Sequence, residues 1–410
     1  MWLPPAFEKP RMRYYALGHG VSVLGGWIQS TALAWLVFRL TGSVSMLGVM
    51  GFLLQIPFLL LGPVTGMVVD RVPRLTLLVI IDAAIIALSF VLAALAWFDV
   101  RSVWPYLVAA VLQGTFNAFE MPTRQALLAV IVEERALQPS ALGVSATLFN
   151  AGRLVGPAIA GLLLLYVSEA WCFIANGLCT MVIIWSLYAM RLPKEEVAPQ
   201  PASGRVGFMD SLSTLGKLPA ARYLLPMMAC IGLFGVPYVH LMPAIAAEFF
   251  QGSSSTFGLM MSASGFGAFA AALFLSMQRN TNLQRKLVTW APMALGLAFA
   301  LFALSRTLWL SLPMLVVIGA SVMCSANATN VLLQQSVSDA WRGRVVGLYA
   351  MSFQGLGPIG TLLSGTVASW VGLSPMLIIN ALLIFSAAAV LTLKLKARPD
   401  VMATIGVEPT

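Results

Sequence analysis

Long apolar stretches recur along almost the whole chain, and they constrain its fold more than any other feature. They lie near residues 13–39, 44–69, 75–98, 103–131, 140–167, 170–190, 221–249, 255–278, 285–304, 308–334, 345–370 and 373–395. A helix needs about 20 mostly apolar residues to cross the hydrocarbon of a bilayer, which is about 30 Å thick. Each stretch therefore predicts a membrane-spanning helix, twelve in all.

The composition agrees with this interpretation and excludes several soluble classes. Of the 410 residues, 59% are apolar and 10% are charged, whereas a soluble domain carries about 25% charged residues. A soluble enzyme, a disordered regulator and a nucleic-acid-binding protein are therefore excluded, although the net charge is +9. The four cysteines lie inside apolar stretches without metal-ligand spacing, so we expect them to be small packing residues.

The cations are shared unequally between the two ends of the predicted helices. Most of the 24 Lys and Arg residues fall at the termini, in the central hydrophilic stretch and in the even-numbered loops, while the opposite loops hold Arg39, Arg101 and Arg306. Cytoplasmic loops are the ones enriched in Lys and Arg, so both termini are predicted to be cytoplasmic. The start of the chain is short and basic and does not resemble a cleavable signal, so we expect the first span to remain as an anchor.

One hydrophilic stretch divides the predicted helices into two sets of six. The predicted organisation is an N-terminal six-helix bundle (1–190), a cytoplasmic linker (191–220), a C-terminal six-helix bundle (221–398) and a cytoplasmic tail (399–410). In the linker, apolar residues from Phe208 onward recur at helical spacing and predict a short amphipathic helix at the membrane surface.

The two predicted bundles repeat short patterns. Asn117-Ala118 recurs as Asn327-Ala328, and Gly156-Pro157 recurs as Gly357-Pro358. Six-helix repeats with a substrate site between them are typical of one large transporter architecture. The predicted fold class is therefore an all-α polytopic membrane protein with two pseudo-symmetric bundles.

The loop after the second predicted span reads Gly66-Met-Val-Val-Asp70-Arg71-Val-Pro73-Arg74. A Gly, an Asp four residues on and then basic residues resemble the loop signature of the major facilitator superfamily, and the resemblance extends over essentially the whole chain. Pro73 and Leu75 depart from the usual pattern. The resemblance implies a gate in which Gly66 lets helices approach and Asp70 accepts hydrogen bonds and pairs with an arginine, as a carboxylate at a helix N-terminus can. We assign Gly66, Asp70, Arg71, Arg74 and Asp82 to this gate.

The fifth predicted span carries Gly143, Gly152, Gly156, Pro157 and Gly161. Their spacing is similar to the superfamily's antiporter motif, which is associated with exporters and implies efflux here. Small residues allow close helix packing and an internal proline bends the helix.

Two further stretches, Phe119–Gln125 and Asn150–Pro157, are similar to one branch of the superfamily. That branch is the bacterial drug:proton antiporters, which include macrolide-efflux and enterobactin-exporter-like proteins. Ala110 stands where other drug antiporters have an arginine, so a proton mechanism based on that arginine is not carried over.

Glu120, Arg124 and Arg153 are charged residues inside predicted spans, where a charge costs about 2.5–3.5 kcal/mol on insertion scales and marks a functional candidate. Glu120 and Arg124 are four residues apart and share a helix face. Arg153 lies near the middle of the next span. We expect these three residues to form one buried proton-coupling cluster, with Glu120 as the protonatable carboxylate; a static ion pair is the alternative.

Aromatic and amide side chains on the same spans are candidates for lining a substrate cavity, because such a lining suits a bulky amphipathic solute. The candidates are Trp27, Gln29, Gln55, Phe116, Asn117, Phe149, Tyr238, Asn327, Asn330 and Phe353. His19 and His240 also lie in spans, and a lone histidine on a helix is more often a hydrogen-bonded packing residue than a titrating one.

These observations favour a proton-coupled exporter of an amphipathic small molecule, such as a drug-like compound or a siderophore, acting as a monomer. The family resemblance implies that it lies in a bacterial inner membrane. The alternative on the same fold is a lipid or lysophospholipid flippase. A receptor or scaffold would not need buried charges. A membrane enzyme is disfavoured because no metal-ligand spacing or nucleophile set is present, and no ATP-binding motif or cofactor site is found.

Overall fold

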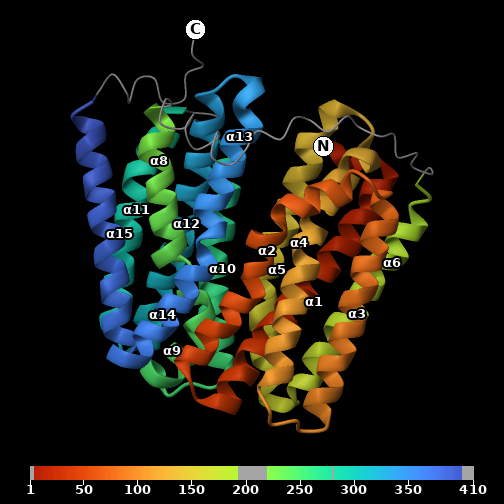
Figure 1. Cartoon of the computed structure of the whole chain (residues 1–410), viewed down its shortest axis with the longest axis horizontal. Coiled ribbons are helices and arrows are strands. Elements are labelled where there is room, and N and C mark those ends of the chain that lie inside the picture. The colour runs from red at the N-terminus through yellow and green to blue at the C-terminus, as the bar shows by residue number, and fades with distance from the viewer. Residues whose placement is uncertain (1–3, 193–218, 279–280, 399–410) are drawn as a thin grey trace. The chain divides into compact units, whose positions relative to one another are not determined.

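A computed structural model describes residues 4–192, 219–278 and 281–398. The predicted linker helix after residue 208 and the tail from residue 399 lie outside these residues. The described chain is α-helical and contains no strand (Figure 1). The first half begins with a short 3-10 helix, η1 (Pro5–Glu8). It continues with α1 (Pro10–Thr41), α2 (Val44–Val69), α3 (Arg74–Trp97), α4 (Trp104–Val132), η2 (Arg135–Leu137), α5 (Gln138–Tyr166) and α6 (Glu169–Ala189).

The second half contains two interrupted helices. Its elements are α8 (Pro219–Cys230), η3 (Ile231–Gly235), α9 (Tyr238–Phe250), α10 (Ser254–Ser276), α11 (Thr281–Leu304), α12 (Leu308–Gln335), α13 (Asp339–Ala350), η4 (Met351–Gly355), α14 (Gly357–Val371) and α15 (Leu373–Lys396). Each of the twelve predicted spans lies on one of these helical segments, so the all-α prediction is confirmed. The two π-helices, η3 and η4, were not predicted.

Ten helical segments of the described chain are long and apolar enough to cross a membrane. The other two predicted spans are α4 and the segment from α13 to α14. Polar residues along α4, including Gln113, Asn117, Glu120 and Arg124, lower its hydropathy. In the other segment, Asp339, Arg342 and Arg344 of α13 lower the hydropathy.

The chain forms two compact units. Unit 1 consists of the described residues of Met1–Gly42, Leu53–Pro201 and Ala246–Gly265, and unit 2 of those of Ser43–Phe52, Ala202–Ile245 and Phe266–Thr410. The start of α2 thus packs within unit 2, and the start of α10 packs within unit 1. The division into bundles at residues 190 and 221 remains a prediction from the sequence.

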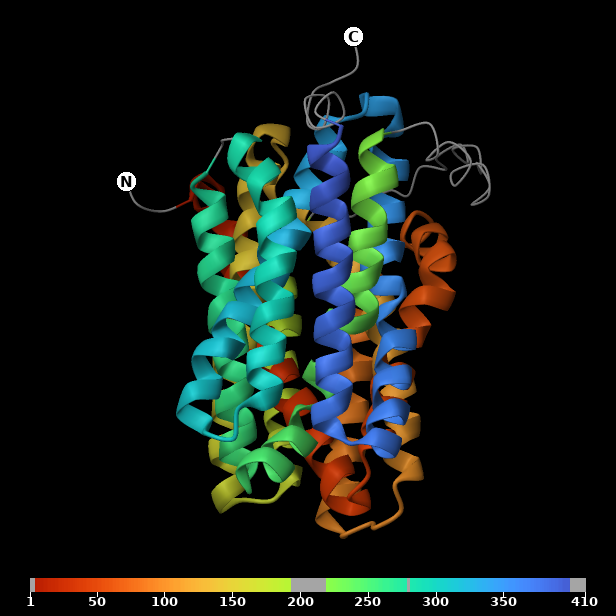
Figure 2. The ribbon, with the colours of Figure 1, turned by 90° about the vertical axis from the view of Figure 1, so that its left-hand side faces the viewer.

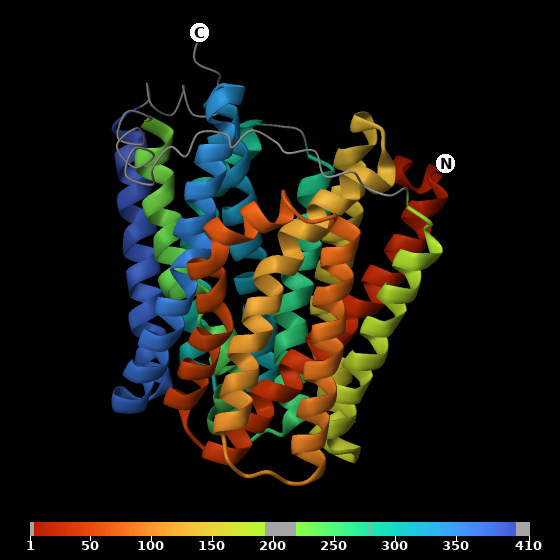
Figure 3. The same ribbon diagram turned by 45° about the vertical axis from the view of Figure 1, so that its right-hand side comes forward.

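In unit 1, α1 packs along both α5 and α6, and α3 packs along α4 and α6 (Figure 3). An apolar core at the end of the unit that holds η1 joins side chains from η1, α1, α3, α4, α5 and α6, among them Tyr15, Leu78, Leu127 and Leu187. Buried apolar packing of this kind fixes the register of α1, α3, α4, α5 and α6, the helices that carry the polar residues described below.

In unit 2, α11 lies between α12 and α15, and α15 also contacts α8 (Figure 2). The two π-helices meet: a Cβ added to Gly232 of η3 would lie 2.4 Å from the carbonyl oxygen of Phe353 in η4. Only a residue without a side chain permits this approach of two backbones.

Candidate functional site

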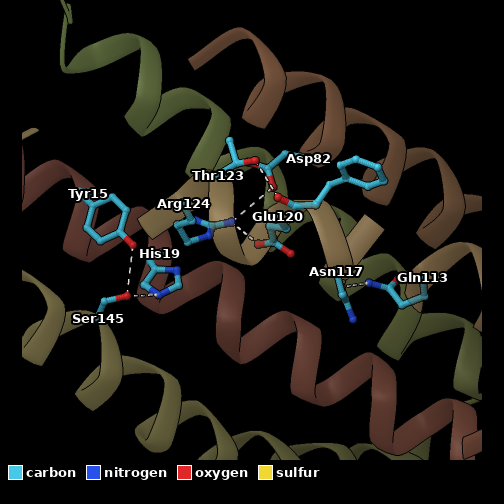
Figure 4. A network of polar contacts seen from close by, with 10 residues as sticks. Tyr15, His19, Asp82, Gln113, Asn117, Glu120, Thr123, Arg124 and Ser145 are labelled. Atoms are coloured by element: carbon cyan, nitrogen blue, oxygen red, sulfur yellow. Dashed lines mark hydrogen bonds and ion pairs between the residues drawn. The ribbon is translucent and has the colours of Figure 1, made fainter. Parts of the chain in front are cut away.

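A charge cluster lies between α3 and α4 in unit 1. The Nη2 atom of Arg124 donates a hydrogen bond to Glu120 Oε1 and lies 3.5 Å from Asp82 Oδ1 (Figure 4). The side chains of Asp82 and Arg124 are 1% and 6% exposed, whereas that of Glu120 is 23% exposed. Asp82, Glu120 and Arg124 are called the charge cluster below.

The positions of these residues along their helices explain the cluster. Asp82 is eight residues from the start of α3 and Arg124 eight residues from the end of α4, so both lie about 12 Å from the same end of the helix pair at 1.5 Å per residue. Glu120 lies on the same face of α4 as Arg124, one helical turn farther from this end of the helix pair. One arginine therefore contacts carboxylates from its own helix and from its neighbour.

Two sequence assignments change at this point. Asp82 was grouped with the gate, but it contacts Arg124 and belongs to the charge cluster. Arg153 was placed in the cluster, but among the described residues no ion pair reaches it. The backbone of α5 at this position packs against α10, because the Arg153 carbonyl oxygen would be 2.7 Å from a Cβ on Gly265.

A second polar group adjoins the cluster. Ser145 of α5 lies 3.3 Å from the hydroxyl of Tyr15 and 3.1 Å from Nε2 of His19, both on α1. The Tyr15 and His19 rings stack with centroids 5.1 Å apart. Figure 4 shows these side chains on the opposite side of Arg124 from the carboxylates. Nδ1 of His19 has no hydrogen-bond partner within the described chain.

A chain of amides forms the third group. Asn176 of α6 donates to Ser89 at 2.9 Å and to Gln29 at 3.0 Å; Gln29 donates to Gln113 at 2.9 Å, and Gln113 to Asn117 at 2.9 Å. Gln29 is buried while Asn117 is exposed. Two of these amides were predicted to line a substrate cavity. Gln29 is buried between the helices, whereas Asn117 is the accessible end of the hydrogen-bonded amides.

The predicted aromatic lining of unit 1 is mixed. The rings of Trp27 and Phe149 meet edge to face with centroids 5.8 Å apart, and Phe149 is 49% exposed. Phe116 instead packs against an apolar cluster formed by α2 and α3. Gln55 is half-buried on α2. Trp27, Phe149 and Asn117 therefore remain the candidates with accessible surface.

The remaining lining candidates belong to unit 2. Tyr238 is 2% exposed and meets Phe299 edge to face, with centroids 5.1 Å apart, so it is a core residue and not an accessible one. Asn330 accepts a hydrogen bond from Gln334 at 3.0 Å, and Asn327 is half-buried on the same helix. Phe353 lies in η4 and stacks on Tyr349. His240 packs against Gly51 of α2.

The glycines of the predicted antiporter motif have different neighbours. A Cβ on Gly152 or Gly156 would lie 2.6 Å from Val23 or 2.5 Å from Trp27, both on α1. A Cβ on Gly161 would lie 2.7 Å from the carbonyl oxygen of Ser254 on α10, and Ser254 Oγ donates to the Gly161 carbonyl at 3.2 Å. A Cβ on Gly143 would meet no atom of another described segment within 4 Å. Pro157 is buried beside Gly156 and its carbonyl approaches Gly258.

The predicted gate loop makes fewer contacts than expected. The backbone N–H of Asp70 donates to the Gly66 carbonyl at 3.1 Å, but the Asp70 side chain is exposed and has no polar contact with the described residues. Among the described residues a Cβ on Gly66 would meet nothing within 4 Å, so they show no close helix approach at this glycine. Arg71 is exposed, and Arg74 begins α3.

Several members of these groups were not singled out from the sequence: Tyr15, Ser89, Gln113, Ser145 and Asn176. The available signal was the occurrence of polar residues in apolar helices, at a spacing of four for the pairs Tyr15–His19 and Gln113–Asn117. No group of His, Cys, Asp and Glu side chains suited to a metal ion occurs in the described part of the chain.

Comparison with known proteins relates the whole chain to membrane transporters. A family model described as transmembrane secretion effector matches residues 6–404. The staphyloferrin A transporter of Staphylococcus aureus is 24% identical over 362 residues, which cover 88% of this chain and 90% of that protein. Macrolide efflux protein A of Streptococcus pyogenes is 24% identical over 387 residues, covering 93% and 95%.

Among solved structures, the fold is similar to that of a bacterial homologue of the human lysosomal transporter Spinster, solved in an inward-facing and unoccupied conformation. The match has a TM-score of 0.72 and 16% identity, and it covers 97% of this chain and 98% of that one. At this identity the likeness concerns the fold alone.

Proposed function

Since the chain belongs to the transmembrane secretion effector family, whose members are membrane transporters of the major facilitator superfamily and not enzymes, we propose that it exports an amphipathic small molecule by proton antiport. Energy would come from the proton gradient, and export would proceed by alternating access between the bundles 1–190 and 221–398.

The charge cluster is the observation that carries the proposal. Charged side chains within a membrane-spanning region are costly, and those that persist there usually line ion or proton pathways. Here a buried arginine contacts two carboxylates from two helices. A cluster that served only to hold α3 and α4 together would need one carboxylate, because the second adds repulsion without a second cation.

The cluster offers a means of coupling. Proton binding to one carboxylate weakens its hold on Arg124 and changes the relative energies of two transporter states. Glu120, the carboxylate chosen from the sequence, and Asp82, which the structure adds, are the two groups that can take the proton.

The direction of transport is supported by two observations. The small residues of α5 pack closely against both α1 and α10, as the resemblance to an exporter motif implies. Two similar proteins are named for the transport of a siderophore and the efflux of macrolides. A related amphipathic substrate would contact the accessible Asn117, Trp27 and Phe149, with Asn327, Asn330 and Phe353 as candidates in unit 2.

The bias of Lys and Arg toward one set of loops supports a bacterial cytoplasmic membrane location with both termini in the cytoplasm. Protons and the solute would be the ligands of a monomeric transporter. The lipid or lysophospholipid flippase remains the alternative activity.

Purified protein in proteoliposomes that contain a pH-sensitive dye tests the proposal. Erythromycin, tetraphenylphosphonium, a citrate-type siderophore and a lysolipid are added separately under an imposed proton gradient. We expect one of the first three to trigger proton movement in wild type and not in Glu120→Gln. Labelled lysolipid that crosses the bilayer without proton movement would support the flippase and contradict the antiporter.

A further inference from the structure

We propose that the charge cluster holds a single exchangeable proton and that Asp82 is the residue that binds it. This inference rests on the proposed proton antiport, and it replaces Glu120 by Asp82 as the carboxylate that carries the proton. Glu120 then has a different task, which is to keep Arg124 engaged while Asp82 gains and loses its proton.

The charge count is the first reason. With both carboxylates ionised, the cluster carries two negative charges and one positive charge, and thus a net charge of −1 beside side chains that are almost fully buried. Net charge is costly to bury, and carboxylates that share a site resist ionising together. Binding one proton makes the cluster neutral, so one proton is the number it can exchange.

The contacts of the two carboxylates decide which of them takes the proton. Glu120 accepts a direct hydrogen bond from Arg124 and its side chain is 23% exposed, so its charge is both paired and partly hydrated. Asp82 is 1% exposed, its nearer oxygen is 3.5 Å from Arg124, and its Oδ2 has no hydrogen-bond partner within the described chain. An ionised oxygen in that position is costly, and an added proton on it removes the charge.

The other neighbours of Asp82 do not supply a competing charge. Arg124 Nη2, 3.5 Å away, is the cation in contact with it, and Glu120 shares that nitrogen. On α6, which also packs along α3, the single carboxylate is Glu169, and it forms an ion pair with Arg39 at 2.9 Å. Tyr15 and His19 on α1 face Arg124 from the other side, and Asp70 is exposed beyond the start of α3.

The cycle follows from this arrangement. A proton from one side of the membrane binds Asp82 Oδ2, forms an O–H bond and leaves Arg124 with Glu120 alone. When the proton departs to the other side, ionised Asp82 competes with Glu120 for the guanidinium. Arg124 contacts both carboxylates through Nη2, and its second terminal nitrogen, Nη1, has no partner among the described residues. A small movement of the guanidinium toward ionised Asp82 would therefore add a hydrogen bond from this nitrogen.

Infrared difference spectroscopy of the reconstituted full-length protein tests the inference without a transported solute. The pH is raised from about 6, where exposed carboxylates of ordinary pKa are already ionised, to alkaline values, and the loss of the carbonyl band of a protonated carboxylic acid is followed. Protein labelled with heavy carbon in the side-chain carboxyl of aspartate is compared with protein labelled in that of glutamate. We expect the titrating band to shift with the aspartate label only.

Four variants sharpen the assignment. In Asp82→Asn and in Glu120→Gln the cluster is a neutral pair, so we expect both to lose the titrating band. Asp99→Asn and Glu248→Gln change exposed carboxylates of the same types and should retain it. A band that shifts with the glutamate label, that persists in Asp82→Asn, or that is absent from wild type would overturn the inference.

The transport assay separates this inference from the proposed function. Proton-coupled transport without an aspartate band would leave antiport standing and refute the role of Asp82. If the aspartate band is present but transport moves no protons, Asp82 still binds a proton, and proton antiport is refuted.

Discussion

Arg124 lies 3.5 Å from Asp82, a residue 42 positions earlier in the chain, and through the same nitrogen it contacts Glu120 on its own helix. One cation thus joins α3 to α4 while two carboxylates compete for it. This relationship makes the cluster sensitive to any change in the number of its charges.

Removal of the arginine should therefore destabilise the protein strongly. Arg124→Gln leaves the buried carboxylate of Asp82 and the partly exposed one of Glu120 without a cation, and breaking a buried ion pair costs about 3–5 kcal/mol. In detergent the melting temperature of Arg124→Gln should be much lower than that of wild type. Arg101 is in an exposed pair with Asp99, so Arg101→Gln should change the melting temperature little. Adding Glu120→Gln to Arg124→Gln should recover part of the lost stability. Asp82 is then the single carboxylate of the cluster, and it can stay protonated and uncharged. A double variant less stable than Arg124→Gln would refute this electrostatic explanation.

Two glycines of the same motif should respond to alanine in opposite directions. A methyl group at Gly161 would collide with the backbone of α10 at Ser254 and Gly258, whereas Gly143 has open space. Gly161→Ala should lower the melting temperature and impair efflux. Gly143→Ala should leave efflux intact and stabilise the helix by up to about 1 kcal/mol, the difference in helix propensity. Equal effects of the two substitutions would show that the α5–α10 contact is unimportant.

Substitutions at two of the hydrogen-bonded amides should have different effects, because Gln29 is buried and Asn117 is exposed. Gln29→Leu leaves buried hydrogen-bonding groups of Gln113 and Asn176 unpaired, which costs about 1–3 kcal/mol. Asn117→Ala changes the exposed end of the chain and should leave the melting temperature unchanged while raising KM for the exported solute. Melting temperatures and initial transport rates measured on both variants test this prediction. A higher KM in Gln29→Leu at unchanged stability would show that Gln29 contacts the solute and is not a structural residue.

An ion pair outside the membrane-spanning segments gives a pH prediction. Lys9 Nζ lies 2.5 Å from Glu134 Oε1, and this hydrogen bond raises the pKa of Lys9 above its ordinary value. A raised lysine pKa stabilises the folded state below the pKa of the unfolded chain, and this contribution is lost as the pH rises through the folded pKa. The melting temperature of wild type should thus exceed that of Lys9→Gln slightly near neutral pH, with the difference vanishing at strongly alkaline pH. A difference independent of pH would exclude the ion pair as its source.

Local sequence patterns predicted what depends on local structure. The twelve helices follow from apolar length, and the Glu120–Arg124 pair follows from a spacing of four on one helix. Asp82 could not be assigned in this way, because its contact with Arg124 depends on how α3 packs along α4. Arg153 was misplaced for the same reason, since its depth in α5 can be read from the sequence but the face it occupies cannot. The π-helices were missed because η3 and η4 arise where backbones meet at Gly232 and Phe353, a tertiary cause.

The most direct test of proton antiport compares two activities of one preparation. Proteoliposomes are assayed for erythromycin accumulation driven by a proton gradient, and for exchange of labelled against unlabelled erythromycin without a gradient. We expect Asp82→Asn and Glu120→Gln to lose driven accumulation and keep exchange, while Asp99→Asn keeps both. Driven accumulation at the wild-type rate in both cluster variants would contradict the account.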